Sequence, residues 1–423
     1  MRPLGVGRSN GRKLARTKKH GTSEIDPERV PRVAFVDHCA LLSGAELALT
    51  RLLPALAVNA HVVLAEEGPL VERLAQVGIV TTVLPMRQRT RTLSRDRVVP
   101  GPAAVRAVID TAFYVWLLRG WLRAHDFDVV HTNSLKAAVY GGLAGRLAGI
   151  PVVWHIRDRI AADYLPIPAV GFIRLLSYLL PTAVVTNSKA TSATLPRARR
   201  TLARVLVLGD ATNIEPRQGV HVVYNAADFG GPRIASSVHG DELAIGIVGR
   251  LAPWKGQDVF LRAFAQAFPT GGHAVVVGSA MFGEQAYERT LHDLVRTLGI
   301  EGRVEFVGFR EDVAAELRKL DVFVHASVIP EPFGQVIIEA MSAGLPVIAS
   351  GAGGPLEIIT DEVDGMFHKP GDADDLASAM QRLAKDPDLR GRLGAAAQRS
   401  VERFRPENIA RDLMMIYYDV VTR

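Results

Sequence analysis

Short apolar runs alternate with helical patterns along most of this chain, and that alternation limits the fold more than any other feature. In the first half, the runs are at 32–36, 62–65, 80–84, 129–131, 152–155, 183–186 and 221–224. They are nearly continuously apolar instead of alternating with polar residues, which is typical of parallel strands covered by helices on both faces. The sequence therefore predicts an α/β protein with doubly wound sheets.

A second series with the same pattern follows a stretch rich in Gly and Pro at 225–241. Its apolar runs are at 244–248, 274–277, 304–307, 322–325 and 347–349. Because one core rarely serves 423 residues, we predict two Rossmann-like domains, at 32–229 and 240–405. We expect the amphipathic helix at 406–423 to pack back on the first domain. Ligands of such sheets bind beyond the carboxyl ends of the strands, here in the cleft between the domains.

Basic residues concentrate near the N-terminus. Residues 1–32 contain nine Lys or Arg and three acids, and the rest of the chain holds 41 of each sign. We predict a disordered basic tail at 1–31, because this stretch lacks apolar periodicity. Two interpretations stay open: the tail lies on an anionic membrane surface, or it is a dispensable solubilising extension. The remainder of the chain is neutral, and we expect no nucleic-acid partner.

The cysteine content and the apolar stretches bear on location. Cys39 is the single cysteine, so no intramolecular disulfide forms, which suits a reducing compartment. The basic tail lacks the continuous apolar segment of a secretory signal. No stretch predicts a transmembrane helix. We therefore expect a cytoplasmic protein that is at most peripheral on the inner face of the membrane.

Two glutamates lie eight positions apart in the run EPFGQVIIE at 331–339. Pro332 disfavours helix at Glu331, so we expect this carboxylate in the loop after the strand that ends near 325. The helix that follows places Glu339 about one turn inside it. The two carboxylates suit sugar hydroxyls at one end and a ribose diol at the other. By spacing alone, an ordinary exposed pair of acids is the favoured interpretation.

The start of the same helix offers backbone donors. The amides of Phe333, Gly334 and Gln335 have no partner inside the helix, and they suit an anion or hydroxyl oxygens. A glycine-rich turn at 351–355 follows another strand and allows close backbone approach to phosphate or sugar. It does not match G-x-G-x-x-G, and no Walker A loop occurs, which weakens the NAD and P-loop interpretations.

Two cations follow the first strand of the second domain, in the run VGRLAPWKG at 248–256. Arg250 offers a fork of donors and Lys255 a point charge, and both stabilise charge that develops on a leaving diphosphate. The alternative is that both are solvated loop cations, the usual situation of Lys and Arg.

Taken together, these runs resemble the family 4 retaining glycosyltransferases of the GT-B fold. The resemblance covers nearly the whole second domain, through VGRLAPWKGQDVFLRAF, VEFVGFREDV, DVFVHAS, EPFGQVIIEAMSAGLPVIAS, GGPLEII and DGMFHKPGD. The first domain is similar more loosely, through SGAE at 43–46, DVVHTNSLKAAVYGGL, PVVWHIRD and VVTNSKAT. One departure lies at 225–228, where the family's Asn-Gly-Val-Asp reads Asn-Ala-Ala-Asp and the linker loses its glycine.

The resemblance implies retaining transfer of a hexose-type sugar from a nucleoside-diphosphate sugar. It implies that Arg250 and Lys255 bind the diphosphate of the donor. It also implies that Glu331 contacts the hydroxyls of the transferred sugar near the reacting centre and that Glu339 binds the ribose. His155, at the end of a first-domain strand, would lie beside the donor sugar; a neutral histidine at the core edge is the alternative.

Further contacts with the donor follow from the same resemblance. Gly44 would approach the phosphates when the cleft closes, and the amides of the 333–335 turn would face the sugar. Gly308, Phe309 and Arg310 would border the nucleobase. No Asp-x-Asp motif follows a strand, and the acids at 372–375 lie in a helical region. We therefore expect neither a metal nor another cofactor.

The acceptor is less well indicated. The resemblance implies a sugar- or lipid-linked hydroxyl in glycolipid, cell-envelope or polysaccharide synthesis. His131 and Asp158 are weaker candidates for contacts to the acceptor or to the sugar. Two alternatives stay open: a GT-B protein that binds sugar nucleotides without transferase activity, and a sugar-nucleotide epimerase.

A basic loop and an apolar helix in the first domain suggest a hypothesis, that they dock on an anionic membrane and present a lipid-linked acceptor. The alternative is a buried amphipathic helix beside a solvated loop. The loop arginines are Arg87, Arg89, Arg91, Arg95 and Arg97, and the helix residues are Phe113, Tyr114, Trp116, Leu117, Trp121 and Leu122.

Overall fold

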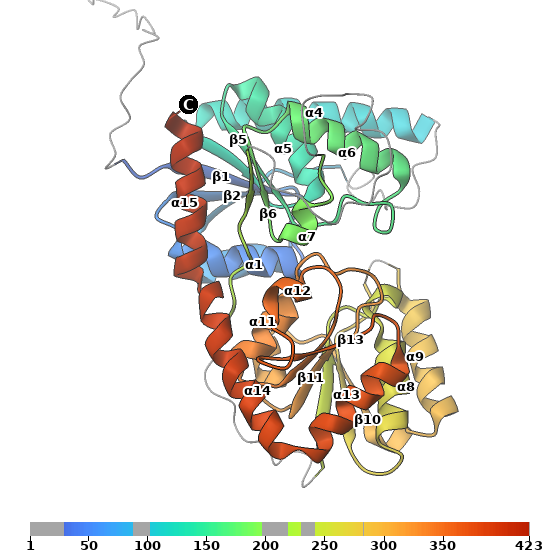
Figure 1. The fold of residues 1–423 in the computed structure, drawn as a ribbon. Helices are drawn as coiled ribbons and strands as arrows, with labels where there is room; N and C mark the ends of the chain where they lie inside the picture. The colour runs from blue at the N-terminus through green and yellow to red at the C-terminus, as the bar shows by residue number, and fades with distance from the viewer. Residues whose placement is uncertain (1–28, 88–101, 197–218, 230–241, 282, 423) are drawn as a thin grey trace, which may run out of the picture.

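Two α/β domains stack on each other in the structure, a computed structural model (Figure 1). It describes residues 29–87, 102–196, 219–229, 242–281 and 283–422. Of the predicted basic tail, residues 29–31 belong to these ranges, and there Arg29 donates two hydrogen bonds to the Asp128 carboxylate. The remainder of that tail, the arginines at 89–97 and most of the linker at 225–241 lie outside the described residues.

The first domain contains a seven-stranded sheet with the order β3-β2-β1-β4-β5-β6-β7. Every pairing in it is parallel, as the continuously apolar runs predicted. The strands are β1 (Arg32–Asp37), β2 (Asn59–Leu64), β3 (Val80–Val83), β4 (Val129–Thr132), β5 (Val152–Ile156), β6 (Ala183–Thr186) and β7 (Val220–Val222).

Helices cover both faces of this sheet. One face packs against α4 (Pro102–Ala124), α5 (Leu135–Ala148) and α6 (Ile167–Leu179). The other packs against α1 (Gly44–Leu52), α2 (Pro69–Gln76) and α15 (Pro406–Thr422). The last helix of the chain therefore shares a hydrophobic core with the first strands, and Figure 1 shows it beside the first domain. Tyr417 is its largest fully buried side chain.

The second domain contains a six-stranded parallel sheet with the order β10-β9-β8-β11-β12-β13. The strands are β8 (Ala244–Val248), β9 (His273–Val277), β10 (Val304–Gly308), β11 (Val322–His325), β12 (Val347–Ser350) and β13 (Met366–His368). The helices are α8 (Gln257–Ala267), α9 (Gln285–Leu298), α10 (Val313–Leu317), α11 (Gln335–Ser342), α12 (Pro355–Ile358), α13 (Ala373–Lys385) and α14 (Pro387–Ser400). The predicted doubly wound α/β class is confirmed.

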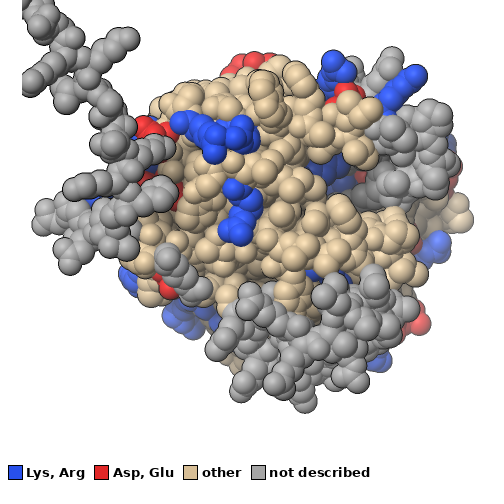
Figure 2. Space-filling view, turned by 90° about the horizontal axis from the view of Figure 1, so that it is seen from above, with Lys and Arg blue, Asp and Glu red and all other residues tan. Residues whose placement is uncertain are grey.

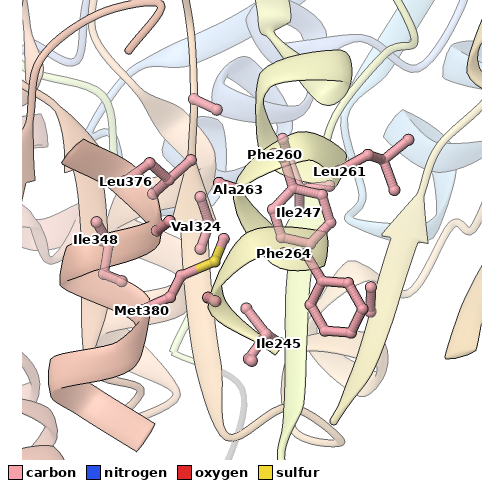
Figure 3. Close-up of a cluster of buried hydrophobic side chains, with 14 of the residues drawn as sticks. Ile245, Ile247, Phe260, Leu261, Ala263, Phe264, Val324, Ile348, Leu376 and Met380 are labelled. Carbon is pink, nitrogen blue, oxygen red and sulfur yellow. The ribbon is translucent and has the colours of Figure 1, made fainter. Parts of the chain in front are cut away.

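Two cores hold the second sheet between its helices. Phe260 and Phe264 of α8 and Met380 of α13 pack over β8, β11 and β12, as Figure 3 shows. On the opposite face, Phe323 and Phe333 pack with α11 and with the short helix that ends at Phe404. Because helices cover both faces of the sheet, a ligand site is expected beyond the carboxyl ends of its strands.

The segment after β7 differs from the expected loose linker. Ala226 and Ala227 are both 1% exposed, and the Ala227 amide donates a 2.9 Å hydrogen bond to the Phe404 carbonyl. Asn225 accepts a hydrogen bond from the buried Arg157, and the Asp228 carbonyl accepts one from Ser342 Oγ at 2.7 Å. The alanines that replace the family's Gly and Val therefore fill a packed crossing between the domains.

Candidate active site

The loops that follow the carboxyl ends of β6 and β11 contact each other between the two domains. Ser188 Oγ donates to the Pro332 carbonyl at 2.5 Å, and Thr191 Oγ1 donates to the same oxygen at 3.2 Å. Glu357 of α12 caps the first-domain helix α7 (Lys189–Ser192), since it accepts the amides of Lys189 and Ala190 at 2.8 and 2.7 Å. The predicted donor site therefore borders a polar contact between the domains.

Glu331 lies in the loop after β11 and is held through one carboxylate oxygen. Lys255 Nζ and Ser327 Oγ both lie 2.8 Å from Oε2, and His325 Nε2 lies 3.3 Å from the same atom. Oε1 has no partner among the described residues, so this oxygen remains for a ligand hydroxyl. Ser327 and His325 were not predicted; both lie at or just beyond the end of the strand run VFVH.

Neighbouring groups keep Glu331 ionised. Burial alone would raise the pKa of its carboxyl, but the charge of Lys255 and the hydrogen bond from His325 outweigh burial and hold the pKa well below its usual range. The Lys255 ammonium in turn lies 4.1 Å from the centre of the Trp254 ring, a cation–π contact that fixes its direction. Arg250 lies near the same ring, at 5.8 Å, and pairs with Glu284 at 3.2 Å.

The start of α11 presents backbone donors beside Glu331. Gly334 takes a left-handed conformation, φ 106°, before the helix begins at Gln335. The amides of Phe333, Gly334 and Gln335 donate to no acceptor within the described ranges. As predicted from the sequence, these N–H groups are unsatisfied at a helix N-terminus, where anions and hydroxyl oxygens bind.

The glycine-rich turn at 351–355 packs closely against another loop of the chain. A Cβ on Gly354 would lie 2.3 Å from the Phe333 carbonyl oxygen, and a Cβ on Gly353 would lie 2.3 Å from the Glu331 carbonyl oxygen. The Gly354 amide donates to that Glu331 carbonyl at 2.8 Å. The close approach is therefore to the chain's own 331–333 loop, and these glycines support the loop that carries the carboxylate.

Glu339 has a partner that the sequence did not indicate. Arg51 of α1 donates to its Oε1 at 2.5 Å across the domain boundary, and Arg51 also lies 3.8 Å from Asp228. Glu339 is 6% exposed. A ribose diol at Glu339 would therefore meet a carboxylate that already binds an arginine of the other domain.

The predicted nucleobase edge lies at the carboxyl end of β10. Gly308 has a φ of 74°, and the space where its Cβ would stand is open. Phe309 is 48% exposed, and Arg310 pairs with Glu316 at 3.5 Å. An exposed ring beside an open backbone is a surface on which a base can stack.

In the first domain, buried polar side chains gather where β1, β4 and β5 end. Asn133 donates to Asp37 at 2.7 Å, and Arg157 donates to Asn133 at 3.0 Å and to Asn225 at 2.5 Å. Ser43, just before Gly44, donates to Glu46. Burial and the nearby Asp37 raise the pKa of Glu46 to about 8, so its carboxyl holds a proton at neutral pH.

Gly44 opens α1 next to this cluster, and nothing lies within 4 Å of where its Cβ would stand. His155 is on β5 as predicted, and it is 1% exposed. His131, a weaker candidate for acceptor or sugar contacts, is buried, and its two ring nitrogens lie 2.9 Å from Tyr417 Oη and 3.2 Å from His155 Nδ1. Asp158 accepts a hydrogen bond from Tyr164 at 2.7 Å.

Within the described residues, no three His, Cys, Asp or Glu side chains are grouped so as to hold a metal ion. Of the acids at 372–375, Asp372 caps α13 and accepts the Asp375 amide at 3.0 Å, while Asp374 and Asp375 lie in the first turn of that helix. In the same ranges, no helix combines the length and the apolar character needed to cross a bilayer.

Comparison with known proteins decides the family. The family model described as "Glycosyltransferase Family 4" matches residues 45–209, and the one described as "Glycosyl transferases group 1" matches residues 233–400. This chain belongs to the family 4 glycosyltransferases. The first match spans β2 to β6 of the first domain, and the second spans all six strands of the second sheet.

Similar proteins include enzymes with different substrates in their names. A D-inositol 3-phosphate glycosyltransferase of Stackebrandtia nassauensis is 28% identical over 313 residues, which is 70% of this chain and 69% of that protein. The lipopolysaccharide core biosynthesis glycosyltransferase LpsE of Rhizobium meliloti is 36% identical over 113 residues, 27% of this chain and 33% of that protein.

A solved structure covers almost the whole glycosyltransferase. The HepE protein of Anabaena, crystallised in complex with UDP and glucose, superposes with a TM-score of 0.76 at 28% identity. The match covers 91% of this chain and 98% of HepE. Another HepE structure holds UDP-glucose, with a TM-score of 0.75. The predicted GT-B fold is confirmed by this agreement of both domains.

Proposed function

We propose that this glycosyltransferase moves a hexose-type sugar from a nucleoside-diphosphate sugar to an acceptor hydroxyl with retention of the anomeric configuration. The observation that carries the proposal is Glu331, whose Oε2 binds Lys255, Ser327 and His325 while Oε1 stays available beside the unsatisfied amides of the α11 start. A fixed carboxylate next to a fixed ammonium and free N–H groups can bind a sugar and its diphosphate together.

We infer that the diphosphate lies between the β8 loop and the start of α11. Arg250 and Lys255 supply positive charge there, and the amides of the 333–335 turn supply hydrogen-bond donors. Both stabilise the negative charge that develops as the bond between the anomeric carbon and the diphosphate breaks. UDP-sugars are the first donors to test, because HepE, at 28% identity, was crystallised with UDP and glucose.

In the proposed reaction, the acceptor oxygen bonds to the anomeric carbon on the face that the diphosphate leaves. The proton of the acceptor hydroxyl passes to an oxygen of the departing diphosphate. Glu331 stays ionised throughout, so it positions the sugar and stabilises positive charge on the ring. Its carboxylate is bound by three side chains, which favours this role over that of a nucleophile that forms a covalent glycosyl intermediate.

We propose that no metal takes part, since Arg250, Lys255 and the α11 amides supply the charge and donors that a diphosphate requires. The test is turnover in excess EDTA, which should equal turnover without it. Activity that EDTA abolishes and Mg²⁺ or Mn²⁺ restores would contradict this part of the proposal.

We propose an acceptor at a membrane surface, in glycolipid or cell-envelope synthesis. On α4, Ile109, Phe113 and Trp116 recur at helical spacing and are 61%, 58% and 66% exposed. Arg106 and Arg123 lie on the same helical face, at either end of this apolar stripe, and both are exposed. Figure 2 shows the surface on this side, where acidic side chains are few and lie mostly near its edge. An apolar stripe between basic ends suits an anionic bilayer.

The proposed function is tested by Glu331→Gln, which keeps the shape of the side chain and removes its charge. We expect sugar transfer from the donor to fall by about a hundredfold or more, the size typical of a lost electrostatic group in an active site. Glu301→Gln, at an exposed glutamate on the same domain, is the matched control and should leave transfer unchanged. The anomeric configuration of the product, read by NMR, tests retention. Equal transfer by the wild type and Glu331→Gln would exclude the assigned role of Glu331.

A further inference from the structure

Three buried side chains connect the C-terminal helix to the end of β5. Tyr417 Oη of α15 lies 2.9 Å from His131 Nδ1 on β4, and His131 Nε2 lies 3.2 Å from His155 Nδ1 on β5. Their exposed fractions are 0%, 1% and 1%. The rings meet edge to face, with the two imidazoles at 74° and Tyr417 at 82° to His131. Residues 286 positions apart in the sequence thus form one continuous hydrogen-bonded chain.

Both histidines are neutral at physiological pH. Burial and the charge of Arg157 together lower the pKa of His131 to about 3, against the opposing effect of Asp37. Burial and Arg157 likewise hold the pKa of His155 well below its usual range. A neutral imidazole carries one N–H, so each ring donates at one nitrogen and accepts at the other. The chain can then run in two directions, and these give His155 opposite tautomers.

Two observations select the direction. The Tyr417 hydroxyl is fully buried and has no other partner among the described residues, so a hydroxyl that only accepted from His131 would leave its own hydrogen unsatisfied. The Arg157 guanidinium, which can only donate, lies 3.5 Å from His155 Nδ1 and favours a lone pair on that atom. The hydroxyl therefore donates to His131 Nδ1, and His131 Nε2–H donates to His155 Nδ1.

We infer that Tyr417 and His131 are positioning residues that fix His155 with its proton on Nε2, so that β5 presents a neutral N–H donor at the donor-sugar position. His155 Nε2 is buried and has no hydrogen-bond partner within the described part of the chain, which is the atom a ligand oxygen would satisfy. This inference rests on the proposed function for its ligand, an oxygen of the transferred sugar. The proton on Nε2 is a property of the protein alone.

The relay gives α15 a function besides packing. The helix follows the second domain in the chain, yet it supplies the hydroxyl that sets the protonation of a first-domain histidine. A phenylalanine at 417 would fill the same space and leave His131 Nδ1 without a donor. The imidazole protons could then shift along the chain, and His155 would lose its fixed donor at Nε2.

The test is ¹⁵N and ¹³C NMR of histidine-labelled full-length protein, which distinguishes the two imidazole tautomers. His155→Gln assigns the signals of His155 by their loss. In the wild type, we expect His155 as the Nε2–H tautomer. In Tyr417→Phe, we expect a mixture or the Nδ1–H tautomer, with kcat/KM for the donor reduced about three- to tenfold, the size of one hydrogen bond. Tyr140→Phe is the matched control, because Tyr140 is equally buried and its hydroxyl has no described partner.

The outcomes separate this inference from the proposed function. An Nδ1–H tautomer of His155 in the wild type overturns the relay, and this measurement does not depend on transferase activity. Unchanged tautomer and kcat/KM in Tyr417→Phe also overturn it. If no donor sugar is transferred by the wild type while His155 shows the Nε2–H form, the relay stands and the proposed function fails.

Discussion

Glu331 and Glu46 are both buried, and their neighbours shift their pKa values in opposite directions. Lys255 and the hydrogen bond from His325 hold the pKa of Glu331 low, against the effect of burial. Burial and the Asp37 charge raise the pKa of Glu46 to about 8. Glu331 of the second domain is therefore a carboxylate at neutral pH. Glu46 of the first domain holds a proton below about pH 8 and loses it above. Pairs of acids pushed apart in this way are common in active sites.

Glu46 gives a prediction about pH and stability. Its pKa in the folded protein lies above the ordinary value of 4.5. The stability it contributes is therefore fully present below the unfolded pKa and is lost as pH rises through about 8. Between these two pKa values the folded state binds one more proton than the unfolded state. The free energy of unfolding therefore falls by about 1.4 kcal/mol per pH unit. We expect Glu46→Gln to remove this slope.

Urea unfolding at pH 5, 6, 7 and 8 measures this pH dependence, as the difference in unfolding free energy between the wild type and Glu46→Gln. The exposed Glu301→Gln serves again as control, because it should reproduce the wild-type dependence. A slope in Glu46→Gln equal to that of the wild type would show that Glu46 is already ionised in the folded protein.

At the scale of helices and strands, apolar periodicity predicted most of the fold, because the parallel strands are buried on both faces and their runs are hard to mistake. It missed β13, whose three residues are Met366–His368, and α14, whose small and charged residues lack a clear apolar stripe. The start of α14 could nevertheless be predicted from the pair Asp386-Pro387. Asp386 accepts the Leu389 amide as the N-cap, and Pro387 is the first residue of the helix.

The positions of the candidate site residues could be predicted where they lie in one continuous run of sequence. The residues that contact them from other parts of the chain could not be predicted. The run at 331–339 placed Glu331 before a helix and Glu339 inside it, as the structure has them. Arg51 comes to Glu339 from 288 positions away, and no local pattern marks it. The close approach of Gly353 and Gly354 to the 331–333 loop was not predicted, because sequence cannot tell which backbone approaches a glycine. Contacts between distant elements depend on the packing of both sheets.

The α4 helix yields a prediction about membranes. Phe113→Ser with Trp116→Ser removes two exposed aromatic side chains without touching Tyr114, Leu118 or Leu122, which are buried. We expect the variant to bind vesicles containing anionic lipid at least tenfold more weakly than wild type, because each aromatic ring adds apolar area at the interface. Flotation with phosphatidylcholine vesicles, with and without phosphatidylglycerol, measures this binding.

The control replaces exposed apolar residues elsewhere. Met415→Ser with Tyr418→Ser changes two side chains of α15 that are 61% and 43% exposed. These changes should leave flotation as it is in the wild type. Equal flotation of the α4 variant and the wild type at low salt would argue that the stripe has another partner.

At the scale of the whole molecule, the two domains meet through contacts of their strand-end loops and through α15. Ser188 and Thr191 hold the Pro332 carbonyl, Arg51 holds Glu339, and Glu357 caps α7. These contacts surround the loop of Glu331, so the geometry of the site depends on how the domains are placed. Ribose at Glu339 would compete with Arg51 for the carboxylate, which couples nucleotide binding to an interdomain ion pair.

The most direct measurement is a crystal structure of the glycosyltransferase with a UDP-sugar or UDP. We predict the diphosphate within hydrogen-bond distance of Lys255, Arg250 and the Gly334 and Gln335 amides, and the ribose hydroxyls on Glu339 in place of Arg51. A nucleotide bound elsewhere, with the Lys255 and Glu331 side chains untouched by ligand, would contradict the account.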